Sequence, residues 1–191
     1  MKDRLMIIVT GAPGTGKTIL SRKISERFSI PLVAKDEIKE LLFDSIGVGD
    51  RQWSLQLSKA SYNLLFNFIA KLLMTNNPFI VEGNFYNGEA TENFMKLKSI
   101  ADFKVLQIQC YTKPETLYTR YKARDNSGER HQGHIQQLPE FHEYKTKVFD
   151  VKCYRLDIDK SVYIDLDTTH FESVNYEQLF NQIEDVLHRE E

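Results

Sequence analysis

Gly11-Ala12-Pro13-Gly14-Thr15-Gly16-Lys17-Thr18 is the stretch that decides the fold of this chain. It matches the phosphate-binding loop pattern G-x-x-x-x-G-K-[ST] at every fixed position. Glycines let a backbone turn through positive φ and point successive N–H groups at an anion. We therefore expect the whole stretch to bind a nucleotide, with Lys17 on its β- and γ-phosphates and the Thr18 hydroxyl holding Mg²⁺.

The residues on either side of the loop supply the context that this motif requires. Met6–Thr10 is a short apolar run rich in β-branched residues, as expected for a buried strand. Leu20, Ile24 and Phe28 then recur at helical spacing. A strand, a loop and a helix in this order place phosphates at a helix N-terminus, where the dipole favours them. A plain glycine turn is the alternative, but such a turn requires neither the lysine nor three glycines.

Composition narrows the class of protein. A length of 191 residues suggests one domain over 1–191, and 41% hydrophobic with 27% charged residues is ordinary for a soluble chain. The net charge of −2 disfavours a duplex nucleic acid partner. No apolar run reaches the length of a membrane span, which argues against a membrane partner. Cys110 and Cys153 match no metal or redox spacing, so we expect reduced thiols and a cytoplasmic protein.

Apolar patterns alternate between strands and helices along the rest of the chain. Further strands are expected at 30–34, 79–82, 104–110 and 161–167, and helices at 36–43, 57–73, 94–101, 114–124 and 176–187, with loops at 45–50 and 125–139. Such alternation predicts an α/β fold, a three-layer α/β/α sandwich with a five-stranded parallel sheet. Ligands bind beyond the carboxyl ends of such strands, so the residues that follow the five strands should face one cleft. These are 11–18, Lys35 and Asp36, Glu82 to Asn84, Thr112 and Lys113, and Asp167 to Thr169.

Phosphoryl transfer is the chemistry that this cleft could support, and Asp36 is the candidate base for the acceptor hydroxyl. The competing interpretation of Asp36 is structural, because aspartate is a favoured N-cap and a helix is expected to begin there. Lys39 lies one turn further along that helix and could bind an anionic part of the acceptor. It could equally be a solvated surface lysine.

Glu82 ends an apolar strand, where a carboxylate can hold Mg²⁺ directly or through water. The alternative is a polar residue that merely emerges from a buried strand. Asn84 follows in the turn after this strand and could hydrogen-bond the acceptor.

Two arginines one turn apart, Arg120 and Arg124, lead into a polar segment that contains Arg130. Arginines beside a mobile loop suit a lid, at about residues 120–140, that closes on a triphosphate and supplies catalytic charge. A solvated basic helix face is the alternative. His131 and His134 invite a metal interpretation, but no acid or cysteine cluster lies near them in the sequence, so zinc is poorly supported.

Taken in order, these motifs resemble the small P-loop kinases, and in particular the group with the 5′-polynucleotide kinase domain, chloramphenicol phosphotransferase and zeta-toxin-type kinases. The chain also looks like nucleoside monophosphate, shikimate and gluconate kinases. The likeness implies a P-loop NTPase fold of the nucleotide-kinase type with a mobile lid. It implies that Asp36 is the base and that Arg124, with Arg120 beside it, is the lid arginine. The group often has aspartate at Glu82 and arginine at Lys39, so this chain departs from it at both positions.

The favoured function is therefore an ATP- and Mg²⁺-dependent kinase that phosphorylates a hydroxyl of a small molecule, with Asp36, Lys39, Asn84 and Arg130 at the acceptor. The alternatives are a 5′-polynucleotide or nucleotide kinase and a nucleotide-binding switch with little transfer activity. The acceptor, the choice between ATP and GTP and the oligomeric state stay open, because fold and reaction class do not determine them.

Overall fold

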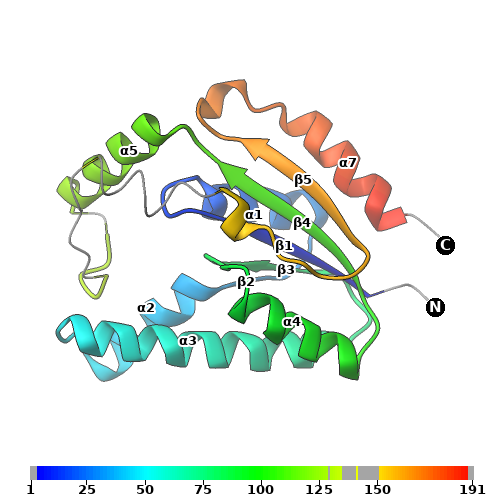
Figure 1. Cartoon of the computed structure of the whole chain (residues 1–191), viewed down its shortest axis with the longest axis horizontal. Helices are drawn as coiled ribbons and strands as arrows, with labels where there is room; N and C mark the ends of the chain where they lie inside the picture. The colour runs from blue at the N-terminus through cyan, green and yellow to red at the C-terminus, as the bar shows by residue number, and fades with distance from the viewer. Residues whose placement is uncertain (1–3, 129, 135–140, 142–150, 189–191) are drawn as a thin grey trace.

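The structure is a computed structural model that describes residues 4–128, 130–134, 141 and 151–188. Strands and helices alternate along the chain as the sequence pattern predicts (Figure 1). The strands are β1 (Leu5–Gly11), β2 (Leu32–Ala34), β3 (Phe79–Glu82), β4 (Lys104–Tyr111) and β5 (Ser161–Asp167). The helices are α1 (Lys17–Phe28), α2 (Lys35–Ile46), α3 (Arg51–Leu72), α4 (Glu89–Ile100), α5 (Pro114–Asn126) and α7 (Tyr176–His188), with 3₁₀ turns at Val151–Tyr154 and Phe171–Ser173.

The five strands form one parallel sheet in the order β2-β3-β1-β4-β5. β1 lies at the centre, with Val9 opposite both Glu82 of β3 and Ile108 of β4. Its apolar residues are buried, as expected for a strand covered on both faces. All carboxyl ends therefore meet at one edge of the sheet, and the loop after β1 lies in the middle of that edge. The predicted α/β fold with a five-stranded parallel sheet is confirmed.

Helices cover both faces of the sheet. On one face α1 meets α7, where the Phe28 and Phe180 rings pack edge to face at 5.9 Å. On the other face α3 and α4 lie side by side, and Phe66 packs against Phe94 at 5.1 Å (Figure 1). These contacts make the three layers that the sequence predicts. None of the helices in the described part of the chain is long and apolar enough to cross a bilayer.

The helix predicted at 57–73 begins earlier, at Arg51, and this difference matters for function. Asp50 caps it, because its carboxylate accepts a hydrogen bond from the Trp53 amide at 2.8 Å. The apolar stripe starts only at Leu57, so periodicity alone missed the first turns. The loop expected at 45–50 is also shorter than expected. α2 continues to Ile46, and Gly47 is its C-cap.

The predicted lid, at about residues 120–140, is described only in part. α5 extends to Asn126, and residues 130–134 lie against α2 and α3. Residue 129 and residues 135–140 fall outside the described part of the chain. The mobility of the lid, and the assignment of 1–191 to one domain, stay predictions.

Candidate active site

The phosphate-binding loop connects β1 to α1 with a backbone that only glycine permits at two points. Gly11 has φ of 142°, and a Cβ there would meet the Cys110 carbonyl oxygen. Gly16 has φ of 82° and forms the N-cap of α1 without any side-chain cap, so the first amides of this helix face the loop. A Cβ on Gly16 would meet the Phe171 ring, which packs against the loop from beyond β5. The loop is therefore shaped to bind an anion through its backbone.

Lys17 closes this loop from one side. Its ammonium donates to the Ala12 carbonyl at 2.9 Å, and the side chain is buried. Burial lowers the pKa of Lys17, while the Glu82 carboxylate acts in the opposite direction. A buried cation held over a ring of amides is well placed to bind phosphate oxygens.

Thr18 and Glu82 meet beside the loop and form a pair of oxygen donors. The Thr18 hydroxyl donates to Glu82 Oε2 at 3.2 Å, and Glu82 is only 4% exposed. Burial raises the pKa of Glu82, an effect that Lys17 and the Thr18 hydrogen bond only partly offset. Hydroxyl and carboxylate oxygens are the ligands that Mg²⁺ prefers, and a divalent cation would neutralise this buried acid. The residues therefore fit Mg²⁺.

Asp36 lies in the first turn of α2, directly after β2, and it does not cap the helix. The N-cap of α2 is Ala34, whereas Asp36 accepts a hydrogen bond from the Lys35 ammonium at 3.0 Å. The capping alternative is therefore wrong, because the helix begins one residue earlier than expected. Partial burial works to raise the pKa of Asp36, but the charge of Lys35, with those of His134 and Lys17, lowers it overall. Asp36 is thus a carboxylate at neutral pH.

Lys39 is buried, so the interpretation as a solvated surface lysine is wrong. Its ammonium donates to the Ser54 hydroxyl of α3 at 3.0 Å and lies over the Phe43 ring. Burial, with the positive charges of Lys35, Arg51 and Arg130, lowers the pKa of Lys39 to about 8. The docking of α3 against α2 places this lysine inside the site.

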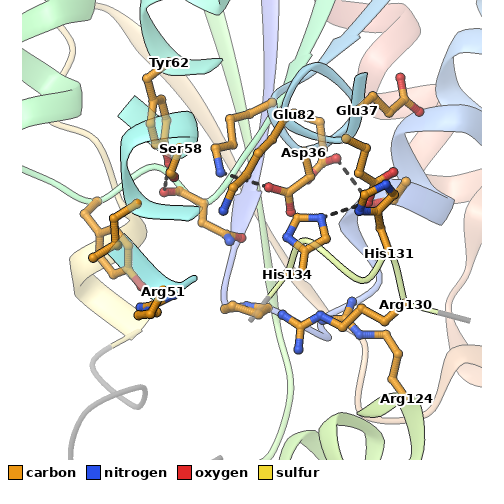
Figure 2. A pocket seen from close by; sticks show the side chains of 18 of the residues that line it. Asp36, Glu37, Arg51, Ser58, Tyr62, Glu82, Arg124, Arg130, His131 and His134 are labelled. Atoms are coloured by element: carbon orange, nitrogen blue, oxygen red, sulfur yellow. Dashed lines mark hydrogen bonds and ion pairs between the residues drawn. The ribbon is translucent and has the colours of Figure 1, made fainter. Parts of the chain in front are cut away.

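A cavity of about 430 Å³ joins Thr18, Glu82, Asp36 and Lys39, whereas Lys17 does not line it (Figure 2). The predicted residues Thr18, Asp36, Lys39, Glu82, Asn84, Arg124 and Arg130 all line it. In Figure 2, Asp36 and Glu82 lie on one side of the cavity, Arg124 and Arg130 lie across from them, and His134 lies between. The remaining lining residues are Pro13, Arg22, Lys35, Glu37, Glu40, Arg51, Leu55, Ser58, Tyr62, Tyr86, His131 and His134.

The arginines of the predicted lid separate into two groups. Arg124 and Arg130 each lie over the ring of buried Tyr121, and both line the cavity. Arg120 points elsewhere: it donates to the Thr169 carbonyl at 3.0 Å and stacks on Phe171 at 3.8 Å. The expectation that all strand ends face one cleft is correspondingly wrong. The residues after β4 and β5 hydrogen-bond one another, as Thr112 and Thr168 do at 2.7 Å, and do not line this cavity.

His131 and His134 pair with acids of α2 instead of gathering around a metal. His131 contacts Asp44 at 3.1 Å and His134 contacts Glu40 at 2.9 Å. Within the described residues no group of three or more histidine, cysteine or acidic side chains could hold a metal ion. Both histidines instead attach residues 130–134 to α2.

Comparison with known proteins agrees with this geometry. Residues 6–145, which include the loop, Asp36 and Glu82, match the family described as AAA domain (AAA_33). The chain belongs to this P-loop NTPase kinase family.

Solved structures extend the likeness of this P-loop NTPase to almost its whole length. A candidate kinase from Chloroflexus aurantiacus J-10-fl is 29% identical, with a TM-score of 0.88 over 97% of this chain and 98% of that chain. A sugar kinase from Janibacter sp. HTCC2649 (10% identity, TM-score 0.56, 98% and 99% covered) shares the fold. So does a gluconokinase from Sinorhizobium meliloti 1021 (13% identity, TM-score 0.52, 98% of each chain covered). No curated protein matches the chain.

The sequence interpretation missed the contribution of α3 to the site of this P-loop NTPase. Arg51, Leu55, Ser58 and Tyr62 line the cavity at successive steps of four, three and four residues. That spacing is a helical face, adjacent to the apolar stripe that begins at Leu57, and it was a usable signal. Tyr62 also donates to the Asn84 carbonyl at 2.8 Å, which positions the turn after β3. One wall of the cavity is therefore a polar face of a long helix.

Proposed function

We propose that this protein is an ATP- and Mg²⁺-dependent kinase that transfers the γ-phosphate to a hydroxyl of a small-molecule acceptor. One observation carries the proposal: the Thr18–Glu82 pair at the phosphate loop and the Asp36 carboxylate line the same cavity. A phosphate-binding site and a candidate base that share about 430 Å³ match the needs of in-line transfer. Family membership and the likeness to the Chloroflexus candidate kinase support the same reaction class.

The groups of the phosphate loop and of the cavity each have a definite task in this reaction. The loop amides and Lys17 bind the β- and γ-phosphates and so orient the γ-phosphorus toward Asp36. Asp36 accepts the proton of the acceptor hydroxyl as its oxygen bonds to the γ-phosphorus, and the bond to the β–γ bridging oxygen breaks to release ADP. Mg²⁺, when held by Thr18 and Glu82, neutralises charge on the phosphates. Arg124 stabilises negative charge as the phosphoryl group moves.

The acceptor occupies the part of the cavity between α2, α3 and residues 130–134. Lys39 binds an anionic part of the acceptor, and Asn84 and Arg130 donate hydrogen bonds to its polar groups. A small polar molecule matches this volume, whereas a nucleic acid end would extend beyond it. The charged lining disfavours an apolar acceptor, because buried charges require polar partners.

A screen of hydroxyl compounds tests the proposal most directly. The purified protein is mixed with Mg·ATP, or with Mg·GTP in a parallel set, and ADP or GDP release is followed with each compound. We expect one chemical class to stimulate release well above the rate with water alone. If neither nucleotide produces heat on titration nor raises the melting temperature at millimolar concentration, the proposed function is wrong.

Arg124→Ala should lower kcat by roughly a hundredfold and change the KM for either substrate by less than about threefold. The reason is that charge on the moving phosphoryl group exists mainly in the transition state. Steady-state kinetics on wild type and variant measure the split. Arg120→Ala is the matched comparison, because that arginine lies on Phe171 outside the cavity. If Arg120→Ala loses kcat and Arg124→Ala does not, the two roles are exchanged.

The KM for the acceptor should rise with pH above about 8. Lys39 has a lowered pKa of about 8, so its charged form is lost as the pH passes that value. An anion binds only the charged form, and the KM should therefore increase about tenfold per pH unit beyond it. Acceptor kinetics between pH 6.5 and 9.5 measure the effect. Lys39→Arg should flatten the profile, because arginine stays charged throughout. A wild-type KM that is constant to pH 9.5 removes Lys39 from the acceptor site.

A further inference from the structure

Ser54 connects two parts of the site that lie far apart in the sequence. It lies in the second turn of α3 and is fully buried. Its hydroxyl accepts a hydrogen bond from the Lys39 ammonium at 3.0 Å and donates one to the Gly133 carbonyl at 3.0 Å. A single side-chain oxygen therefore joins α2, α3 and residues 130–134, which we call the roof segment.

The roof segment is seated on α2 by packing as well as by this hydrogen bond. A Cβ on Gly133 would collide with the Phe43 ring, so only glycine fits this close approach. His131 stacks on the same ring at 5.4 Å, and His134 meets it edge to face at 6.1 Å. The backbone of the roof segment is thus fixed over the acceptor end of the cavity.

Lys39 needs a partner that directs its charge. Among the described residues no carboxylate forms an ion pair with this lysine, although the side chain is only 6% exposed. An ammonium has three donors, and Ser54 takes one of them. The other acids of this wall are engaged with different partners: Asp36 with Lys35, Glu40 with His134 and Glu37 with Arg22. The hydroxyl of Ser54 therefore holds the Lys39 ammonium by a hydrogen bond, and the Phe43 ring supports it from beneath.

We propose that Ser54 is a positioning residue for the phosphoryl acceptor, because its hydroxyl aims Lys39 into the cavity and holds the roof segment above it. The inference rests on the proposed kinase function for its use in catalysis, but the arrangement itself is independent of activity. Acceptor binding and seating of the roof segment are then one event, since both depend on the same oxygen. Removal of the hydroxyl leaves a buried ammonium and a buried carbonyl each without this partner.

The test uses the full chain and three substitutions of Ser54. Ser54→Ala removes the hydroxyl, and Ser54→Thr with Ser54→Val forms a pair of equal shape that differs in the hydroxyl alone. Ser61→Ala is the matched control, because Ser61 is also fully buried in α3 but donates to the Ser58 carbonyl of its own helix. The Thr and Val variants both add a methyl group at a fully buried position, so their comparison isolates the hydroxyl, while Ser54→Ala adds no bulk.

The first readout is hydrogen exchange at the Gly133 and His134 amides, which donate to Nδ1 and the carbonyl oxygen of His131. Ser54→Ala should exchange these amides about tenfold faster than wild type, and Ser54→Val about tenfold faster than Ser54→Thr, while Ser61→Ala should match wild type within about twofold. Equal exchange in the threonine and valine variants overturns the seating role of the hydroxyl.

The second readout is the Lys39 ¹³Cε resonance, with the phosphate loop saturated by Mg·ADP and inorganic phosphate as the anion probe. Loss of the hydroxyl should move the Lys39 titration to lower pH and weaken phosphate binding at Lys39 at least about fivefold. If Ser54→Ala leaves both unchanged, Ser54 does not position this lysine. A failure of the kinase proposal is distinguishable, because it appears as absent nucleotide binding or turnover in wild type, while the hydrogen-exchange readout needs no nucleotide and retains its meaning.

Discussion

Lys17→Ala is expected to lower kcat/KM by at least about a thousandfold. The ammonium is buried beside the loop amides and donates to the Ala12 carbonyl, so no solvent ion can replace it at the same place. Nucleotide binding should weaken as well, because the charge acts on the phosphates in both ground and transition states. Nucleotide titration calorimetry and steady-state kinetics measure the two effects.

Lys23→Ala is the matched control for this experiment. Lys23 lies on the same helix, is exposed and rests on the Tyr176 ring at 4.9 Å. Its loss should change kcat/KM by less than about twofold, because an exposed charge that does not line the cavity contributes little. A Lys17→Ala protein that keeps wild-type turnover would remove the phosphate loop from the mechanism, and the other assignments would fall with it.

Asp36→Asn is expected to reduce kcat by about 10²- to 10⁴-fold and to leave Mg·ATP affinity within about threefold of wild type. Asparagine keeps the shape of the side chain and its contact distance to Lys35 but cannot accept a proton at neutral pH. Measurement of acceptor turnover next to nucleotide affinity separates the loss of a base from the loss of the site.

The neighbouring acid provides the control for Asp36. Glu37 lines the same cavity but forms a half-exposed ion pair with Arg22 at 2.9 Å, so Glu37→Gln should change kcat by less than about threefold. If the loss falls on Glu37→Gln instead, the base is Glu37. If neither variant loses turnover, another group is the base. If wild type binds nucleotides but turns over no acceptor, the chain is a nucleotide-operated switch, which is the alternative that the sequence left open.

The parts of the site that follow from backbone rules could be predicted from the sequence. The loop at 11–18 has a pattern in which the spacing of the glycines, the lysine and the threonine predicts phosphate binding. Glu82 ends an apolar strand that is expected to lie beside this loop. The topology then brings Thr18 and Glu82 to 3.2 Å, because parallel strands end at one edge. Asp36 lies at the cavity for the same reason.

The parts that depend on docking between elements could not be predicted. Lys39 looks like a surface lysine until α3 packs against it, and the direction of Arg120 depends on where Phe171 lies. The contacts of His131 and His134 with α2 join residues about ninety positions apart, and no local pattern encodes such pairs. The wall formed by α3 was recoverable in principle from the spacing of Arg51, Leu55, Ser58 and Tyr62.

The strand order has a practical consequence for protein engineering. Since β1 lies at the centre of the sheet, the phosphate loop after β1 and the wall built by α2 and α3 come from separate stretches of the chain, and the Arg22–Glu37 ion pair joins α1 to that wall. The α2–α3 hairpin is one contiguous stretch, 35–72, and we expect it to be exchangeable between homologues where an acid at position 37 is kept for Arg22. A chimera of this kind should have the acceptor specificity of the protein that supplies the hairpin. The roof segment must be taken from that same protein.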